Sequence, residues 1–261
     1  MKYGFIGCGN MGGAIAKALA ATTKNILVAD PSANAKVLAD SLGIETSENQ
    51  TVAKTCDRIF LAVKPQILHS VVKEIAPVLA QRKPLLITMA AGIEICQIEE
   101  MVGTPLPIIR IMPNTPVAVG KGMILYCHNN LVASEDIVSF LEDMQYAGQL
   151  DPLDEKLIDA ASALSGSGPA YMYLFLDAMA DGAVACGLPR AKAITYAAAT
   201  MEGAAQMLLQ TGSHPACLKD AVCSPGGSTI AGIQALEDKG FRGAVIDCIM
   251  AAYKRNKELG K

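Results

Sequence analysis

The sequence predicts an α/β protein in two parts: a doubly wound parallel sheet over residues 1–150 and an all-helical region over residues 151–261. Three observations support this fold class. Short apolar runs alternate with helical stretches in the first part, which is the pattern of consecutive βαβ units. A glycine-rich turn joins the first apolar run to the first helical stretch. From about Asp151 onward no convincing strand is found, and long stretches rich in Ala and Met follow.

The apolar runs of the first part end in turn residues, as expected for strands buried in a sheet. We expect strands at residues 2–6, 25–30, 58–65, 84–92, 107–116 and 122–129. Stretches of helical composition lie between most of them, at residues 13–21, 33–42, 65–80 and 94–101, and a further amphipathic stretch follows at 134–148. Strands that alternate with helices in this way pair in parallel, because each helix returns the chain to the same edge of the sheet.

The second part is expected to contain only helices, which are interrupted where Gly, Ser and Pro cluster. These breaks fall at residues 165–169, 187–189, 211–215 and 224–227. Small residues such as Ala193, Ala197 and Gly203 allow helix backbones to approach each other closely. Helices that are apolar around their circumference need further surface to cover them, so we expect this region to pack against a second subunit.

Composition argues against several classes of protein. The net charge is -3 and basic residues form no cluster, so the chain lacks the electrostatic footprint of a nucleic-acid-binding protein. The eight cysteines form no C-x-x-C pair and the three histidines are isolated. We therefore expect neither a metal site nor a disulfide framework.

We expect neither a signal peptide nor a membrane span. Met1 and Lys2 lead straight into a short apolar strand, which leaves no room for the apolar region of a signal peptide. Apolar stretches such as residues 160–176 are interrupted by polar residues and by a Gly-Pro pair. Together with the scattered cysteines, this favours a soluble protein of the reducing cytoplasm.

The glycine-rich turn matches the pattern G-x-G-x-x-G at Gly7, Gly9 and Gly12. Alone this motif is a weak signal, but here a strand precedes it, a helix follows it, and Asp30 closes the second strand about twenty residues later. The first glycine permits the tight turn, the second lets a pyrophosphate approach the backbone, and the helix N-terminus offers free N–H groups. We therefore predict a Rossmann-type dinucleotide-binding domain whose cofactor is NADPH or NADH.

The choice between the two cofactors stays open. The Asp30 carboxylate can accept hydrogen bonds from a ribose 2′-hydroxyl and would repel a 2′-phosphate, which favours NADH. Ser32 and Lys36 lie nearby in the sequence and keep NADPH open. The later strand ends AVKP (62–65) and MAAG (89–92) fall at the sheet edge where ligands bind, so we expect them to line the cofactor. The alternative is that they are turns only.

The stretch CSPGGST, residues 223–229, must be a loop, because inside a helix Pro costs about 3 kcal/mol and each Gly about 1 kcal/mol relative to Ala. This stretch and ALSGSGPAY, residues 163–171, both place Ser and Gly directly before an apolar helical run. Each is therefore a helix N-terminus with accessible backbone, and such ends attract anions. A small carboxylate could dock there without an arginine. The alternative is helix capping alone.

Seven motifs along the chain occur together, in one order. They are GFIGCGNMG, FLAVKP, MAAG, MPNTP, LSGSGPAY, HPACLKD and SPGGSTIAGIQALE. With them the chain resembles the pyrroline-5-carboxylate reductases over essentially its whole length, and the SPGGSTI segment is highly specific to that family. The resemblance implies an NAD(P)H-dependent oxidoreductase that reduces 1-pyrroline-5-carboxylate to L-proline, the last step of proline biosynthesis. It also implies that the helical region is an all-α substrate-binding and dimerisation domain of a homodimer or higher homo-oligomer.

Together with the motif analysis, the resemblance assigns site residues by position. The cofactor-binding residues would be Gly7, Cys8, Gly9, Asn10, Met11, Gly12, Asp30, Asn49, Ala62, Val63, Lys64, Pro65, Ala90, Ala91, Gly92 and Asn114. The substrate-binding residues would be Glu155, Ser224, Gly226, Gly227, Ser228 and Thr229. In the family the late Pro-Gly-Gly loop holds the carboxylate of the substrate or of proline.

Some of these assignments carry a finer expectation. The resemblance implies that Asn49 lies at the adenosine ribose, Asn114 near the nicotinamide, and Glu155 near the ring nitrogen of the substrate. Ala221 departs from the family, since some members have a cofactor-contacting Asn there. Asp30 also departs, because many members have Ser or Asn-Arg at this place, which leaves the cofactor preference open.

Hydride transfer to the electrophilic imine carbon needs no covalent intermediate, so the main task of the protein would be to orient two bound reactants. No His or Lys is suited to strong acid catalysis. Thr229 is therefore the candidate catalytic residue, because its hydroxyl could hydrogen-bond the ring nitrogen and steer its protonation, directly or through water. The alternative is a hydroxyl that only begins a helix.

Two other functions are weighed against this one. A β-hydroxyacid dehydrogenase also joins a dinucleotide domain to a helical one, but it should show a helical Lys with Asn four residues later, and no lysine after residue 150 has that partner. A dinucleotide sensor without catalytic activity would need only the first part of the chain. It would leave the two glycine-serine loops unexplained.

Overall fold

The computed structural model describes residues 1–259, so residues 260 and 261, at the end of the predicted helical region, lie outside the described residues. The chain folds as two compact units. Within the described residues, unit 1 contains Met1–Pro169 and residues 252–259, and unit 2 contains Ala170–Ala251. The predicted boundary near residue 150 falls within the last strand of unit 1. The division into a cofactor domain and a substrate domain stays a prediction.

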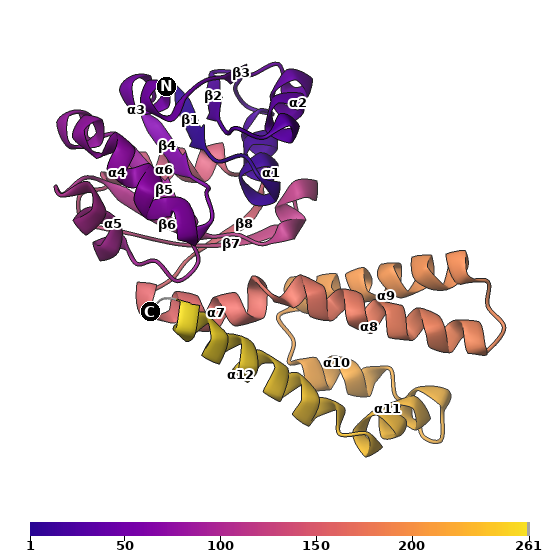
Figure 1. Cartoon of the computed structure of the whole chain (residues 1–261). Coiled ribbons are helices and arrows are strands. Elements are labelled where there is room, and N and C mark those ends of the chain that lie inside the picture. The colour runs from indigo at the N-terminus through magenta and orange to yellow at the C-terminus, as the bar shows by residue number, and fades with distance from the viewer. Residues whose placement is uncertain (260–261) are drawn as a thin grey trace. The chain divides into compact units, whose positions relative to one another are not determined.

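An eight-stranded sheet forms the middle of unit 1 (Figure 1). Its strands are β1 (Tyr3–Ile6), β2 (Ile26–Ala29), β3 (Glu45–Thr46), β4 (Arg58–Leu61), β5 (Leu85–Thr88), β6 (Ile108–Met112), β7 (Gly122–His128) and β8 (Gly148–Pro152). Their order across the sheet is β3-β2-β1-β4-β5-β6-β7-β8. All neighbours run parallel except β6 and β7, which are antiparallel. The first six strands thus have the order of a Rossmann fold.

Helices cover both faces of this sheet. They are α1 (Asn10–Leu19), α2 (Ala33–Leu42), α3 (Asn49–Thr55), α4 (Pro65–Arg82), α5 (Ile95–Val102), α6 (Ser134–Asp143) and α7 (Ile158–Ser165), with short 3-10 turns η1 (Thr115–Val119) and η2 (Glu155–Leu157). One core joins α1, α2 and α6 to the sheet, and its rings Phe5 and Phe60 stack with centroids 4.4 Å apart. A second core joins α3, α4 and α5 to the opposite face. Apart from Arg58, Thr88 and Arg110, the buried residues of the central strands are apolar on both sides, as expected for parallel strands covered by two helix layers.

Each predicted strand is present, but two further strands were missed. β3 has only two residues, both exposed. β8 follows α6, which ends at Asp143 rather than extending to residue 148 as predicted. The sequence of β8, GQLDP, is polar and without apolar alternation, so its strand form depends on pairing with β7 from Gly122 to Tyr126. The prediction that strands cease near Asp151 is wrong by two residues, because pairing overrides local preference.

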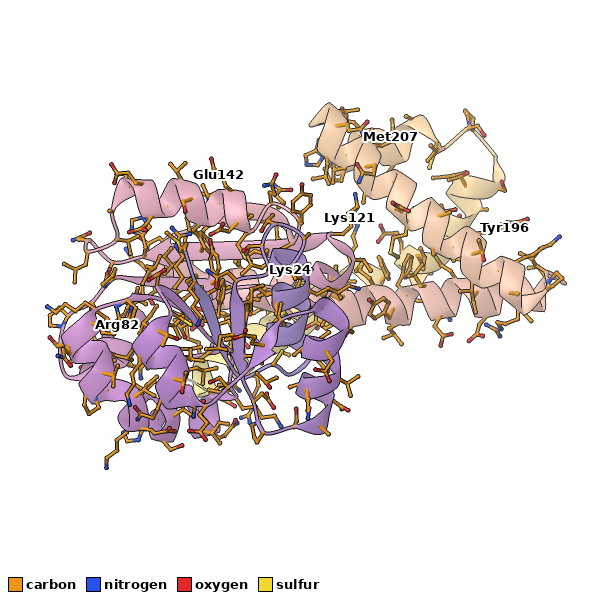
Figure 2. The ribbon with its side chains drawn as sticks, turned by 90° about the horizontal axis from the view of Figure 1, so that it is seen from above. Lys24, Arg82, Lys121, Glu142, Tyr196 and Met207 are labelled. Carbon is orange, nitrogen blue, oxygen red and sulfur yellow. The ribbon has the colours of Figure 1, made fainter. Side chains whose placement is uncertain are left out.

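Unit 2 is entirely helical within the described residues. Its helices are α8 (Gly168–Ala185), which begins in unit 1, α9 (Arg190–Thr211), α10 (Pro215–Ala221), α11 (Ser228–Asp238) and α12 (Phe241–Leu259), which returns to unit 1. Large apolar side chains on α9 are solvent-exposed, including Tyr196 and Met207, each 54% exposed (Figure 2). The few fully buried positions of this unit are alanines such as Ala180 and Ala193. A sheet unit followed by helices confirms the predicted fold class.

Among the described residues, no helix combines the length and the apolar character that a membrane crossing requires.

A buried arginine ties three elements of unit 1 together. Arg58 of β4 is 1% exposed, and its guanidinium pairs with Asp136 and Asp143 of α6. The Tyr3 hydroxyl of β1 donates to the same Asp143 carboxylate, at 2.7 Å. Burial and the nearby Asp143 raise the pKa of Tyr3, so its hydroxyl stays a donor at every physiological pH. This cluster fixes α6 on the sheet.

The substitution Gly148→Ala should destabilise unit 1 strongly. Gly148 has φ 141°, and an added Cβ would lie 2.1 Å from the backbone oxygen of Gly122 on the neighbouring strand. We expect a loss of about 3 kcal/mol in the free energy of unfolding, measured by urea titration. Gly43→Ala is the control, because Gly43 has φ 65° but open space around it, and it should lose only about 1 kcal/mol. Equal losses would contradict the steric explanation.

Candidate active site

The glycine-rich turn between β1 and α1 is packed against the backbone after β4. Gly7 has φ 91°, and an added Cβ there would lie 2.6 Å from the Ala62 carbonyl oxygen. A Cβ at Gly12 would lie 2.7 Å from the Gly7 oxygen and 2.8 Å from the Ala62 side chain. Neither position has room for a side chain. The predicted reason for the first glycine, a tight turn, agrees with this geometry, and the structure adds that the third glycine lets α1 pack closely against Ala62.

Gly9 differs from its two partner glycines. It is exposed, its φ is -69°, and an added Cβ would meet nothing within 4 Å. Gly9 is also the residue before α1, whose N-terminus has no side-chain cap and no acidic residue in its first turn. The fold therefore does not itself require glycine here, but a pyrophosphate approaching the open helix end would. The residues present fit a dinucleotide.

Asp30 stands at the end of β2, next to this turn. Its Oδ2 accepts a hydrogen bond from the Cys8 N–H at 2.6 Å, and its Oδ1 accepts one from the Ser32 N–H at 2.8 Å. Burial alone would raise the pKa of the Asp30 carboxyl, but the hydrogen bonds from Ser32 and Cys8 outweigh it and hold the pKa below its ordinary value. The side chain is therefore an anion at neutral pH and is aimed at the glycine turn.

The other predicted cofactor residues of unit 1 follow the ends of neighbouring strands. Ala62 to Pro65 follow β4 and begin α4, and Ala90 to Gly92 follow β5. Because β1, β2, β4, β5 and β6 are parallel, all these turns lie at one edge of the sheet, where ligands bind in this fold. The structure thus brings the glycine turn, Asp30 and both later turns to the same edge.

Two asparagines of the predicted site make hydrogen bonds within unit 1. Asn114, which follows β6 and is 8% exposed, accepts from the Met123 N–H at 2.9 Å and donates to the Ser165 carbonyl at 2.9 Å. It therefore links the end of β6 to β7 and to the last residue of α7. Asn49 begins α3 and donates to the Glu74 carboxylate at 2.9 Å, on the surface.

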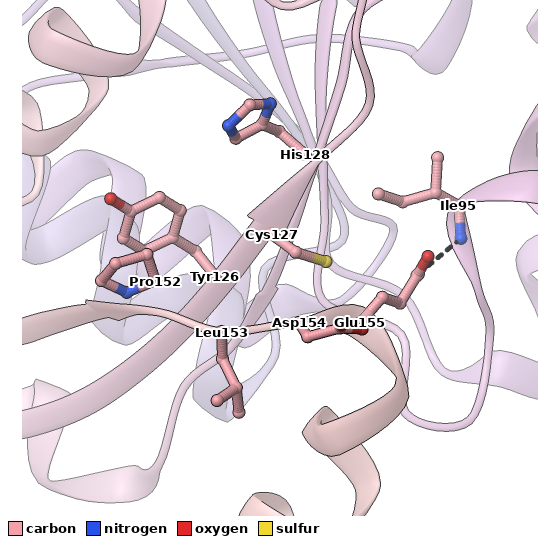
Figure 3. Close-up of a pocket in the computed structure, with 8 residues that line it drawn as sticks. All are labelled: Ile95, Tyr126, Cys127, His128, Pro152, Leu153, Asp154 and Glu155. Atoms are coloured by element: carbon pink, nitrogen blue, oxygen red, sulfur yellow. Dashed lines mark hydrogen bonds between the residues drawn. The ribbon is translucent and has the colours of Figure 1, made fainter.

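A network around Arg110 occupies the face of the sheet that carries α5 and α7. Arg110 of β6 is 2% exposed and donates to Glu155 Oε1 at 3.0 Å. The same carboxylate oxygen accepts from the Ile95 N–H at the start of α5, at 2.8 Å (Figure 3). Arg110 also lies 3.7 Å from Asp159 of α7, which pairs with Lys257 at 3.4 Å. Arg110 thus contacts η2 and α7 directly. Through Glu155 it is linked to the start of α5, and through Asp159 to the end of α12.

Glu155 therefore has a structural role, because its carboxylate bonds both Arg110 and the Ile95 N–H. It lines a pocket of about 380 Å³ with Ile95, Tyr126 and Asp154 (Figure 3). Glu155 belongs to unit 1, whereas the other predicted substrate residues belong to unit 2. Its predicted proximity to the ring nitrogen of the substrate stays a prediction.

The predicted substrate loop lies in unit 2, between α10 and α11. Gly226 has φ 65°, which favours glycine, and an added Cβ at Gly227 would lie 2.3 Å from the Ser224 hydroxyl and 3.1 Å from the Ser224 carbonyl oxygen, so side chains here would strain the turn. Gly227 precedes α11, which has neither a side-chain cap nor an acidic residue in its first turn. Ser228 and Thr229 are the first two residues of that helix and are exposed. The predicted loop and helix start are confirmed.

Two cysteines beside the predicted site residues, Cys8 and Cys127, are poor candidates for nucleophilic chemistry. All eight cysteines are free thiols. Burial, with the Asp30 charge nearby, raises the pKa of Cys8 to about 11, and burial with the Glu155 charge raises that of Cys127 to about 12. Both are neutral thiols at pH 7 and hence poor nucleophiles. No group of three or more His, Cys, Asp or Glu side chains within residues 1–259 is arranged to hold a metal ion.

An open helix end behind the glycine turn, with an anchored carboxylate beside it, defines unit 1 as a dinucleotide-binding unit of the Rossmann class. Two family models match the chain: residues 2–92 match that of coenzyme F420-dependent NADP oxidoreductases, and residues 155–259 match that of pyrroline-5-carboxylate reductase dimerisation.

Individual relatives give the same result over the whole length. The pyrroline-5-carboxylate reductase of Escherichia coli is 43% identical, with 100% of this chain and 98% of the relative covered. That of Pisum sativum is 40% identical, with 98% and 95% covered. The crystal structure of the Plasmodium falciparum pyrroline carboxylate reductase with NADP bound is 35% identical, with a TM-score of 0.91 and 100% and 98% covered. The chain belongs to the pyrroline-5-carboxylate reductase family.

Several predictions from the sequence are confirmed by this membership. The family, the oxidoreductase class and NAD(P)H as the cofactor are as predicted. The match to a dimerisation model indicates a homo-oligomer that acts on a small molecule. Sequence reasoning did not find the Arg110 network. The sequence feature that could have revealed this network is the arginine inside the apolar strand IIRIM, because a buried charge requires a partner.

The substitutions Gly9→Ala and Gly12→Ala should separate cofactor binding from folding. Gly9→Ala has free space, so its melting temperature should stay within about 2 °C of the parent, while its KM for NAD(P)H rises at least tenfold because the methyl group lies where a pyrophosphate approaches. Gly12→Ala meets backbone and should unfold at a clearly lower temperature. Thermal melts and steady-state kinetics measure both effects. A Gly9→Ala enzyme with unchanged KM would exclude this loop as the pyrophosphate site.

The substitution Glu155→Ala should destabilise unit 1 by about 3 kcal/mol, because it removes the nearest counter-charge of a buried arginine. Glu100→Ala is the matched control, an exposed carboxylate on α5, and should change stability by less than about 0.5 kcal/mol. Denaturant unfolding measures the free energies. A stable Glu155→Ala protein that has lost affinity for the substrate would instead assign Glu155 to the substrate.

Proposed function

We propose that this chain reduces 1-pyrroline-5-carboxylate to L-proline with a hydride from NADPH or NADH, the last step of proline biosynthesis. The names of its relatives support the reaction. The observation that carries the assignment of the site is the open N-terminus of α11 behind the Pro-Gly-Gly turn. A helix end with uncapped N–H groups and no nearby acid suits a small carboxylate.

The cofactor would be held at the edge of the sheet in unit 1. The residues proposed for it are Gly7 to Gly12, Asp30, Asn49, Ala62 to Pro65, Ala90 to Gly92 and Asn114. The glycine turn would receive the pyrophosphate at the start of α1, and Asp30 would bind the adenosine ribose. Asn114 would act by position, since both ends of its amide already bond backbone groups.

The substrate would be held by the loop of unit 2, through Ser224, Gly226, Gly227, Ser228 and Thr229. The backbone N–H groups at the start of α11 would bind the carboxylate, because the first N–H groups of a helix have no partner within it. Gly226 and Gly227 keep this surface free of side chains, and the Ser224 carbonyl accepts a hydrogen bond from the Gly227 N–H across the turn, at 3.0 Å. Specificity for an acid thereby needs no arginine.

The bound nicotinamide would supply the hydride. The chain's own residues would contribute orientation and a hydrogen bond, and no covalent intermediate is needed. The Thr229 hydroxyl, exposed on the first turn of α11, would hydrogen-bond the ring nitrogen and steer its protonation. Thr229 is thus the proposed catalytic residue.

The same proposal covers assembly and location. The exposed apolar helices of unit 2 support a homodimer or a higher homo-oligomer formed through residues 151–261, with residues 1–150 as the cofactor domain. Eight free cysteines are consistent with a reducing cytoplasm.

The substitution Thr229→Val should lower kcat/KM for 1-pyrroline-5-carboxylate at least tenfold, because it replaces a hydroxyl by a methyl group of the same shape. Thr195→Val is the matched control, since the Thr195 hydroxyl donates to its own helix, and it should keep parental kinetics. Steady-state assays at saturating cofactor, with a thermal melt to check folding, measure the effect. Unchanged turnover in Thr229→Val would refute the catalytic assignment.

A further inference from the structure

The carboxylate of Asp30 is fixed by backbone contacts on both of its oxygens. The Cys8 N–H, within the glycine turn, holds Oδ2, and the Ser32 N–H, at the start of α2, holds Oδ1. A side chain held from two sides cannot swing away from a ligand without losing both bonds. The negative charge is therefore a permanent feature of the surface beside the turn.

Each carboxylate oxygen can accept more than one hydrogen bond. Backbone N–H groups use one lone pair of each Asp30 oxygen, and the Ser32 side chain is a further hydrogen-bond partner of the carboxylate. The lone pairs that are left can accept from ribose hydroxyl donors. A phosphate on the ribose 2′-oxygen would bring acceptors and a charge of about -1.5 to -2 against this anion. Like charges without a donor between them repel, most strongly where burial limits screening.

Ser32 and Lys36, the two residues that left NADPH possible in the sequence analysis, do not offset the negative charge of Asp30. The Ser32 hydroxyl accepts from the Ala35 N–H at 3.3 Å as the cap of α2. Lys36 is exposed one turn into α2, where its charge is screened by solvent. No arginine lies between Asp30 and Ile44, so the bidentate partner that suits a phosphate is missing from this stretch.

We propose that this chain selects NADH over NADPH and that Asp30 is the residue that determines this specificity. The inference rests on the proposed function, in which Asp30 binds the adenosine ribose. It goes beyond the NAD(P)H dependence stated there, because it names one nucleotide and the residue that selects it.

The test compares the two reduced cofactors on the parent chain and on two variants. Kd values for NADH and NADPH are measured by nicotinamide fluorescence, and kcat/KM values are measured with 1-pyrroline-5-carboxylate. In the parent, NADH should bind at least tenfold more tightly and show the higher kcat/KM. Asp30→Asn keeps an acceptor oxygen but removes the charge, and should reduce the preference at least tenfold, mainly by improving NADPH. Asp40→Asn, an exposed carboxylate later on α2, makes the same charge change and should preserve the preference.

The outcomes separate this inference from the proposed function. Equal or tighter binding of NADPH by the parent would overturn the inference, as would an unchanged preference in Asp30→Asn. If both cofactors bind but neither is oxidised by 1-pyrroline-5-carboxylate, the proposed function fails while the binding ratio still decides the inference. A thermal melt shows whether Asp30→Asn is folded. If it is not, the inference is tested on the parent chain alone, by its ratio of Kd values for NADH and NADPH and by inhibition with adenosine and adenosine 2′-phosphate. Stronger inhibition by adenosine 2′-phosphate would overturn the inference.

Discussion

The geometry of the candidate cofactor site depends on the packing of the glycine turn against Ala62. Gly7 and Gly12 lie so near Ala62 that neither could carry a Cβ. This contact draws the start of α1 onto the strand ends of β1 and β4, where the strand order of the sheet reverses. With its N-terminus at this point, α1 directs its free N–H groups toward the edge of the sheet where a dinucleotide binds in this fold. Gly9 takes no part in this packing and stays exposed to solvent, since Gly7 and Gly12 alone make the contact with Ala62.

Two buried arginines connect the helix layers to this sheet from opposite sides. Arg58 meets acids of α6, and Arg110 meets Glu155 and Asp159. Burying a cation is costly, and the attraction of one acid seldom offsets that cost, so each arginine contacts two. We infer that these ion pairs serve mainly to fix the positions of the helices on the sheet, and less to raise the free energy of unfolding. Arg110 and Glu155 together hold the start of α5 and, through Asp159, the end of α12, which carries the chain back from unit 2.

The sequence predicted those parts of the fold that follow from local chemistry. Buried strands such as β4 and β5 are recognisable because three of their four residues are apolar. The glycine turn is recognisable because Gly7 and Gly12 permit what no other residue does. The strand β8 was missed because it is polar and depends on its neighbour. The contact of Glu155 with the Ile95 N–H joins residues 60 positions apart. Spacing along a chain does not encode such a contact.

Unit 2 presents a different physical situation from unit 1. Its large apolar side chains, including Leu209 at 69% and Met250 at 63% exposed, remain in contact with solvent in a single chain. Surface of this kind is stable when another subunit covers it, and the match to a dimerisation model indicates that the chain forms a homo-oligomer. The stability of such helices depends on protomer concentration. The proposed substrate loop lies between α10 and α11 of this unit, so its surroundings belong to the part of the chain that matches the dimerisation model.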